Sequence, residues 1–267
     1  MKINKRYSWR RMAIVAGVLG AFCLMGCKRI SAYDYSPCLN VSVEATRHLT
    51  EDASSPFCDF SMDYSYLDAK GDSINQLINE GIQREFLGEK YASLTPHQAT
   101  EDFKNDYLND YQKELLEIYQ ADIARNDSNG IELPPWYNRT FSLVTFIEEG
   151  CEKIVGVSAN YFIDMGGAHP NQWSQWVNFD AQTGALLKME DVFDMEKKEE
   201  VEKLLQEAVN KQDVALYPDA KITIPNNFLL GKKGVRFLYN RYDIAPRSSG
   251  SIEVELSYEA IEHCLKR

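Results

Sequence analysis

The sequence predicts an α+β protein in which two helices from the N-terminal half and one from the C-terminal half pack on an antiparallel sheet. Two observations lead to this class. Apolar residues alternate with a period of two in several segments that are joined by short turns, as in hairpins. The helical segments lie in sequence between groups of strands and do not alternate with single strands.

In the first half, alternating apolar residues predict strands over residues 39–46 and 57–67. The Ser73-Ile74-Asn75-Gln76 run has the spacing of a capping box and predicts a helix start, with Gly88 as the stop. A second start, Thr95-Pro96-His97-Gln98, has proline in the first turn, where its missing N–H is not needed. The stripe that follows at helical spacing is expected in the core: Ala99, Phe103, Tyr107, Tyr111, Leu115 and Ile118.

In the second half, period-two alternation predicts strands over residues 141–147, 155–163 and 173–179, followed by a turn over 180–184. A helix is expected over 196–211, and its outward charges indicate a solvated face. The chain closes with strands predicted at 227–230, 235–240 and 251–257 and a short helix at 258–264. We therefore expect an N-terminal α+β subdomain over 38–135 and a C-terminal α+β subdomain over 136–267.

Charge excludes one class of partner. The 267 residues hold 29 Lys and Arg against 40 Asp and Glu, a formal net charge of −11. Phosphate binding needs clustered basic residues, so nucleic acid is not an expected partner. Residues 1–26 carry five of the basic residues and no acid, which leaves 24 basic against 40 acidic residues, a net charge of −16, in the remainder.

The N-terminus reads as an export signal. Basic residues up to Arg11 precede a short apolar run that ends in Leu24-Met25-Gly26-Cys27. This ending resembles a bacterial lipobox, which implies a signal peptide over 1–26, lipid attachment at Cys27 and a tether over 27–37. An uncleaved anchor, or cleavage elsewhere, is the alternative. By similarity to lipoproteins of the Bacteroides type, we expect a periplasm-facing protein on the outer rather than the inner membrane.

Four further cysteines could form two disulfides in an oxidising compartment, and buried free thiols are the alternative: Cys38, Cys58, Cys151 and Cys264. The sequence contains no C-x-x-C pair, so it supports neither a redox motif nor a zinc knuckle.

No known catalytic or cofactor motif is present. The histidines are far apart in sequence and none forms an H-x-H or H-E-x-x-H pattern: His48, His97, His169 and His263. There is no Gly-x-Ser-x-Gly elbow, phosphate-binding glycine loop or dinucleotide fingerprint. We therefore predict no catalytic residue, no metal and no cofactor.

One segment stands out as a candidate ligand loop, because two glycines, a histidine and an asparagine follow a predicted strand. Its candidate residues are Asp164, Gly166, Gly167, His169 and Asn171. Glycines permit positive φ or close backbone approach, and loops on a rigid sheet commonly carry sites. The alternative is a tight hairpin whose imidazole bonds to its own backbone.

A family resemblance enters with this segment. Gly166-Gly167-Ala168-His169, then Val177-Asn178-Phe179-Asp180 and Asp191-Val192-Phe193, resembles a run of the RsiV-like extracytoplasmic domain. The segment Tyr242-Asp243-Ile244-Ala245-Pro246 resembles that domain's closing motif, with Arg247 where the family usually has tyrosine. The upstream strands and the helix with Asn75 and Asn79 are similar to the region that precedes it in RsiV and PdaC-type deacetylases.

The resemblance implies a binding module. The outer domain of RsiV binds lysozyme, and by this resemblance Tyr242, Asp243, Pro246 and Arg247 would form a second surface motif. Anti-sigma activity is not expected, because a lipobox stands in place of the membrane-spanning helix. No catalytic motif of the PdaC-type enzymes transfers, since their deacetylase domain lies downstream of this module.

Three hypotheses remain. The first is a non-catalytic, membrane-anchored envelope module that recognises peptidoglycan or a basic protein such as lysozyme, whose approach the acidic charge would favour. The second is a hydrolase of envelope glycans or peptides that uses His169 with a carboxylate such as Asp164. The third is a structural or assembly lipoprotein without a small ligand.

Overall fold

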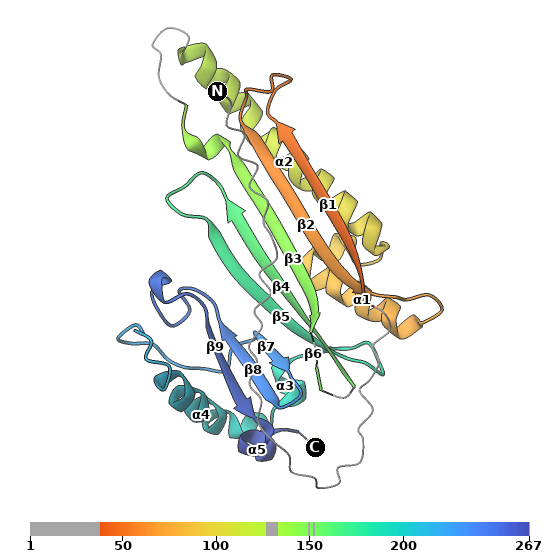
Figure 1. The fold of residues 1–267 in the computed structure, drawn as a ribbon, viewed down its shortest axis with the longest axis vertical. Coiled ribbons are helices and arrows are strands. Elements are labelled where there is room, and N and C mark those ends of the chain that lie inside the picture. Colours follow the sequence, from red (N-terminus) through yellow and green to blue (C-terminus); the bar gives the residue numbers. More distant parts are fainter. Residues whose placement is uncertain (1–37, 127–132, 149, 152, 267) are drawn as a thin grey trace, which may run out of the picture. The chain divides into compact units, whose positions relative to one another are not determined.

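The computed structural model describes residues 38–126, 133–148, 150–151 and 153–266. The predicted signal peptide, Cys27 and the tether lie outside the described residues. Two sheets and their covering helices form the described part of the chain, so the predicted α+β class is confirmed (Figure 1). Among the described residues, no helix is both long and apolar enough to cross a membrane.

The larger sheet has six strands in the order in which they occur in the chain. They are β1 (Cys38–His48), β2 (Phe57–Leu67), β3 (Arg139–Glu148), β4 (Ile154–Asp164), β5 (Asn171–Asp180) and β6 (Leu186–Leu187). All neighbours are antiparallel except β2 and β3, which are parallel. The sheet therefore differs from the predicted antiparallel one at this pairing, because the chain between these strands crosses over through two helices.

The crossover helices α1 (Ser73–Phe86) and α2 (Pro96–Asn126) cover one face of this sheet (Figure 1). Thr95 caps α2 as predicted. Its hydroxyl oxygen accepts from the backbone N–H of Gln98, and the side-chain oxygen of Gln98 accepts from the backbone N–H and the hydroxyl of Thr95. The predicted cap of α1 is wrong. Asp72, not Ser73, is the N-cap, because its carboxylate accepts from the Ile74 and Asn75 amides at 2.9 and 3.0 Å.

Aromatic rings fill the layer between α2 and the sheet. Phe60 of β2 stacks on Phe141 of β3 with ring centroids 4.9 Å apart, and Phe103 and Tyr107 of α2 close over both. The helix stripe is thus core as predicted, except that Ile118 is 48% exposed. Its neighbour Tyr119 is buried instead and packs against Tyr137.

The second sheet has three antiparallel strands, β7 (Phe228–Leu230), β8 (Gly234–Tyr239) and β9 (Ile252–Ser257). Helix α4 (Lys198–Asn210) packs on this sheet through Val201, Leu205 and Val209, and not on the larger sheet as predicted. The short helices α3 (Met189–Val192) and α5 (Tyr258–Ile261) complete this part. Strands β3–β5, which lie beyond the predicted boundary at 135/136, share a sheet with β1 and β2.

Asparagine side chains join the two sheets. Asn178 of β5 donates to the Phe228 carbonyl at 2.8 Å and accepts from the Leu230 amide at 2.9 Å. Asn227 accepts from the Trp176 amide and donates to the Ser174 carbonyl. Each side-chain amide hydrogen-bonds as a backbone peptide group in a neighbouring strand would, because it presents one donor and one acceptor to the other sheet. A small apolar cluster, Trp176, Leu229 and Leu238, lies beside them.

Candidate functional site

The loop after β4 is held by two backbone constraints. The Asp164 carboxylate accepts a hydrogen bond from the Gly166 amide at 2.9 Å, which forms a tight turn. Gly166 has φ of +66°, and a Cβ atom at this position would lie 2.2 Å from the Pro135 carbonyl oxygen. Glycine is required here for both reasons. Asp164 and Gly166 therefore shape the loop and anchor it on the 3₁₀ turn Pro135–Tyr137.

His169 lies exposed on this loop. Its imidazole makes no hydrogen bond to the described part of the chain, and neither a carboxylate nor a nucleophile pairs with it there. Asp164, the partner considered for a hydrolase, is already used by the Gly166 amide. The structure thus assembles no acid–base pair around His169 within the described residues.

The second sequence motif follows β8. The Asp243 carboxylate accepts from the Asn240 amide at 2.7 Å and closes the turn, so Asp243 has a structural role. Tyr242 sits in this turn with φ of +73°, a backbone conformation that is rare for tyrosine, and its side chain is 56% exposed. Ile244 is buried in the core of the second sheet, and Pro246 leads into the 3₁₀ turn Arg247–Ser249.

The structure brings the two motifs together. Arg247 donates to the Pro170 carbonyl at 3.2 Å, and Arg241 donates to the side-chain oxygen of Gln172. These contacts define a cleft of about 260 Å³, which we call the arginine cleft. It is lined by Pro170, Asn171, Gln172, Trp173, Arg241, Tyr242 and Arg247.

The arginine cleft continues into a second hollow of about 350 Å³ over the ends of β4 and β5. The two share Gln172, Trp173 and Arg241. Trp173 stacks on Tyr161 with ring centroids 4.5 Å apart and planes 6° apart, and this pair packs with the core of the larger sheet. The elongated surface itself carries polar side chains such as Ser142 and Asn160.

Charge in the arginine cleft is unbalanced. Within the described residues, neither Arg241 nor Arg247 forms an ion pair with a carboxylate. Some other arginines do find acidic partners, as Arg139 does with Glu114 and Arg236 with Glu253, whereas Arg47 donates to the amide oxygens of Asn109 and Gln112. Two unneutralised guanidinium groups beside an exposed tyrosine favour a planar anionic group such as a carboxylate as ligand.

The predicted site residues are therefore partly united. Asn171, Tyr242 and Arg247 line one cleft, whereas Asp164, Gly166, Asp243 and Pro246 support it from outside. Sequence reasoning missed Gln172, Trp173 and Arg241. Alternation had assigned Trp173 to a strand, and Gln172 lies between that strand and the candidate loop. Arg241 was detectable, since it directly precedes the Tyr242 motif.

Among the described residues, Cys38, Cys58 and Cys264 form no disulfide. Cys38 and Cys58 lie at opposite ends of the β1–β2 pair, where their register partners are Leu67 and Arg47. Cys38, Cys58 and Cys264 are free thiols, and Cys151 contacts Tyr258. Burial raises the pKa of Cys58 to about 12.

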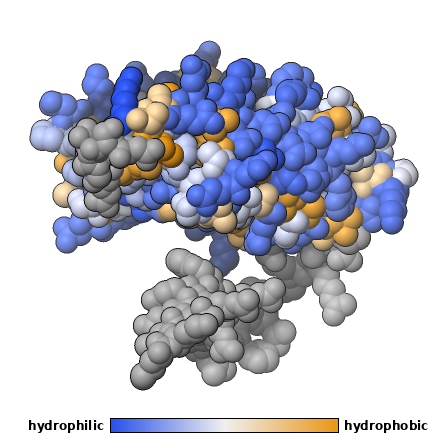
Figure 2. All heavy atoms as spheres, turned by 90° about the horizontal axis from the view of Figure 1, so that it is seen from above, coloured by the Kyte–Doolittle hydropathy of each residue, from blue (hydrophilic) through white to orange (hydrophobic). Residues whose placement is uncertain are grey.

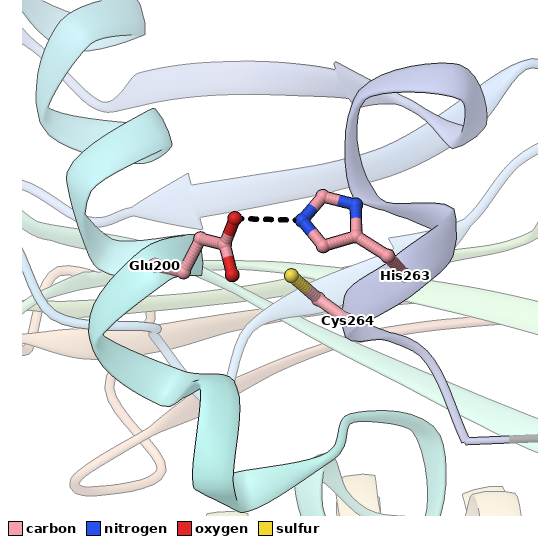
Figure 3. A group of neighbouring side chains, drawn as sticks. All are labelled: Glu200, His263 and Cys264. Atoms are coloured by element: carbon pink, nitrogen blue, oxygen red, sulfur yellow. Dashed lines mark hydrogen bonds and ion pairs between the residues drawn. The ribbon is translucent and has the colours of Figure 1, made fainter.

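A group of three side chains with metal-ligand chemistry lies away from the arginine cleft in the sequence. Glu200 of α4 meets His263 and Cys264 near the end of the described chain (Figure 3). The His263 Nε2 atom lies 2.7 Å from Glu200 Oε1. Sequence reasoning missed this group, because more than sixty residues separate Glu200 from the other two.

Comparisons with known proteins give a family of unknown function. Residues 190–259 match the DUF3298 family, described as proteins of unknown function. The chain is also similar to the crystal structure of a DUF3298 family member from Bacteroides fragilis NCTC 9343, with 25% identity and a TM-score of 0.78. That alignment covers 86% of this chain and 94% of the other.

A more distant likeness shows the fold alone. A DUF3298 family protein from Pseudomonas aeruginosa PAO1 aligns with 18% identity and a TM-score of 0.58, over 87% of this chain and 95% of that one. No curated protein sequence matches this chain. The finer resemblance to RsiV-like and PdaC-type domains stays a prediction.

Proposed function

We propose that this protein is a non-catalytic binding module of the bacterial cell envelope, anchored through a lipid on Cys27. Its ligand is a carboxylate-bearing fragment of peptidoglycan, bound in the arginine cleft. The observation that carries the proposal is the pair of guanidinium groups of Arg241 and Arg247, which have no acidic partner in the described chain. In a chain with 40 acidic residues, such a pair marks a local preference for an anion.

The neighbouring side chains suit the rest of such a ligand. Peptidoglycan combines sugar rings, which have apolar faces, with amides and free carboxylates. Exposed Tyr242 offers an aromatic face, and Asn171 and Gln172 offer amide groups. Arginine binds a carboxylate in a two-pronged geometry that lysine does not provide. Each chemical part of the ligand thus has a partner in one cleft.

The surface supports binding of a small polar ligand over an apolar docking partner. On the face seen in Figure 2, hydrophilic residues dominate and apolar residues occur in small separate groups. A basic protein such as lysozyme would instead use the acidic charge of the chain, for example the outward carboxylates of α2, including Asp102, Asp110 and Glu117.

The test is titration calorimetry of the purified protein with soluble muropeptides, neutral N-acetylglucosamine oligomers and lysozyme. We expect muropeptides to bind and the neutral oligomers to bind far more weakly. Arg247→Gln should raise the muropeptide Kd about 10–100-fold, because it removes a charge-assisted hydrogen bond. Arg125→Gln changes an exposed arginine on α2 and serves as the matched control.

Two outcomes would contradict the proposal. Equal affinity for muropeptides and neutral oligomers would show that the carboxylate is not recognised. Binding of lysozyme alone, with salt dependence and no effect of Arg247→Gln, would favour the protein partner. Chromatography of the same mixtures should show intact muropeptides; their cleavage, if lost in His169→Ala, would instead establish the hydrolase hypothesis.

A further inference from the structure

Glu200, His263 and Cys264 offer a carboxylate, an imidazole and a thiol to one small volume. Their ligand atoms all lie within 4.8 Å of one another. Cys264 is fully buried, whereas the side chains of Glu200 and His263 are about half exposed. Figure 3 shows the three groups converging from α4 and from the turn that follows α5. The buried sulfur forms the floor of the group and the other two reach solvent.

We propose that this group is a binding site for a divalent transition-metal ion of the zinc class. Thiolate, imidazole and carboxylate are the three ligand types that zinc takes from proteins. Calcium and magnesium favour sites made of oxygen ligands, and only one of these side chains supplies oxygen. Three protein ligands leave the fourth tetrahedral position to water, on the side where Glu200 and His263 are exposed.

The ligands are held by structure that does not depend on the metal. The Asp194 amide donates to the Cys264 carbonyl at 2.9 Å, and Phe193 forms a β-bridge with Leu265. Glu200 lies in the first turn of α4, whose next residue, Val201, is buried in the core of the second sheet. A preformed site loses less entropy when it binds an ion than a disordered one would.

The carboxylate and imidazole atoms are close to the separation that a tetrahedral ion needs. His263 Nε2 and Glu200 Oε1 are 2.7 Å apart and share a hydrogen bond. Metal bonds of about 2.0–2.1 Å at a tetrahedral angle place two such ligand atoms roughly 3.3 Å apart. Binding would therefore move the Glu200 and His263 ligand atoms apart by well under 1 Å, and these half-exposed side chains are free to rotate that far. Cys264 coordinates as the thiolate, and its proton passes to solvent.

The site differs from the arginine cleft in chemistry and in residues, so the two proposals stand independently. A bound ion would tie the last turn of the described chain to the start of α4, in addition to the bridge that Leu265 already forms with Phe193. The segment Lys197–Glu200 already contacts this turn without a metal, because the Lys197 ammonium donates a hydrogen bond to the His263 carbonyl. The metal would thus hold the turn Glu262–Cys264 in place against α4.

Cobalt(II) provides the direct test, because it takes zinc-like geometry and absorbs light. We expect titration of the purified protein with Co²⁺ to produce a thiolate-to-cobalt charge-transfer band in the near ultraviolet and strong visible bands, both removed by added Zn²⁺. Cys264→Ser should abolish the charge-transfer band. His263→Ala and Glu200→Gln should weaken the affinity at least about 10-fold.

Two variants serve as matched controls. Cys38→Ser changes an exposed thiol, and Glu199→Gln changes the carboxylate next to Glu200 in α4; both should leave the spectrum unchanged. A charge-transfer band that persists in Cys264→Ser, or is lost in Cys38→Ser, would overturn the proposal, as would the absence of any band. If Cys264→Ser does not fold, the exposed His263→Ala variant decides the question.

Discussion

Removing the Asn178 side chain should weaken the contact between the two sheets and lower the free energy of unfolding. Asn178 is 1% exposed, and its amide pairs the Phe228 carbonyl at 2.8 Å and the Leu230 amide at 2.9 Å. Asn178→Ala leaves both backbone groups buried without partners. Each orphaned group costs about 1–3 kcal/mol, so we expect a loss of about 2–6 kcal/mol in the free energy of unfolding. That is a large share of the stability of a typical domain.

Urea and thermal unfolding measure this loss. For a protein of this size, about 4 kcal/mol lowers Tm by roughly 8–16 °C. Asn160→Ala is the matched control: this asparagine lies on the neighbouring strand β4, but it is exposed and bonds only to the Ser174 hydroxyl. We expect the control to lose about 0–1 kcal/mol. Equal unfolding midpoints for the two variants would refute the idea that the Asn178 amide joins the sheets.

Two further predictions concern packing and thiol chemistry. Gly81→Ala in α1 should destabilise the protein by about 1–3 kcal/mol despite better helix propensity, because the new Cβ atom would lie 2.4 Å from the buried Phe179 ring; a raised urea midpoint would contradict this packing. Cys58, whose pKa burial raises to about 12, should resist alkylation at pH 8 in the folded protein while Cys38 is modified. Near pH 9 the Cys58 thiol ionises in the unfolded chain but not in the folded protein. The contribution of Cys58 to the free energy of unfolding should therefore be complete below that pH and lost as the pH rises toward 12. Unfolding of the wild type and of Cys58→Ala at several pH values would measure this loss.

Local chemistry made most elements predictable. The Thr95 capping box and the period-two strands depend on neighbours in sequence, and the structure bears them out. Errors arose where two adjacent residues competed for one role. Asp72 replaced Ser73 as the cap because its carboxylate reaches two amides, and Tyr119 replaced Ile118 in the core because spacing from Leu115 continues in steps of four.

Contacts between distant segments could not be predicted from spacing. The parallel pairing of β2 with β3 depends on how α1 and α2 cross the sheet, and no local pattern encodes it. The arginine cleft was half visible, because Tyr242 and Arg247 form a motif but their meeting with residues 170–173 is tertiary. Glu200 and His263 meet across more than sixty residues without a recognisable spacing.

The parallel pairing also fixes the order in which the strands can pair during synthesis. Strand β2 ends at Leu67 and its partner β3 begins at Arg139, so about 70 residues must be made before the pairing can form. At synthesis rates of about 5–20 residues per second, β2 waits roughly 4–14 s. During that interval the apolar face of β2, which includes Phe60 and Met62, can be covered from solvent only by β1 and the two helices. The long polar α2 therefore serves as an early cover for a strand whose final neighbour has yet to be synthesised.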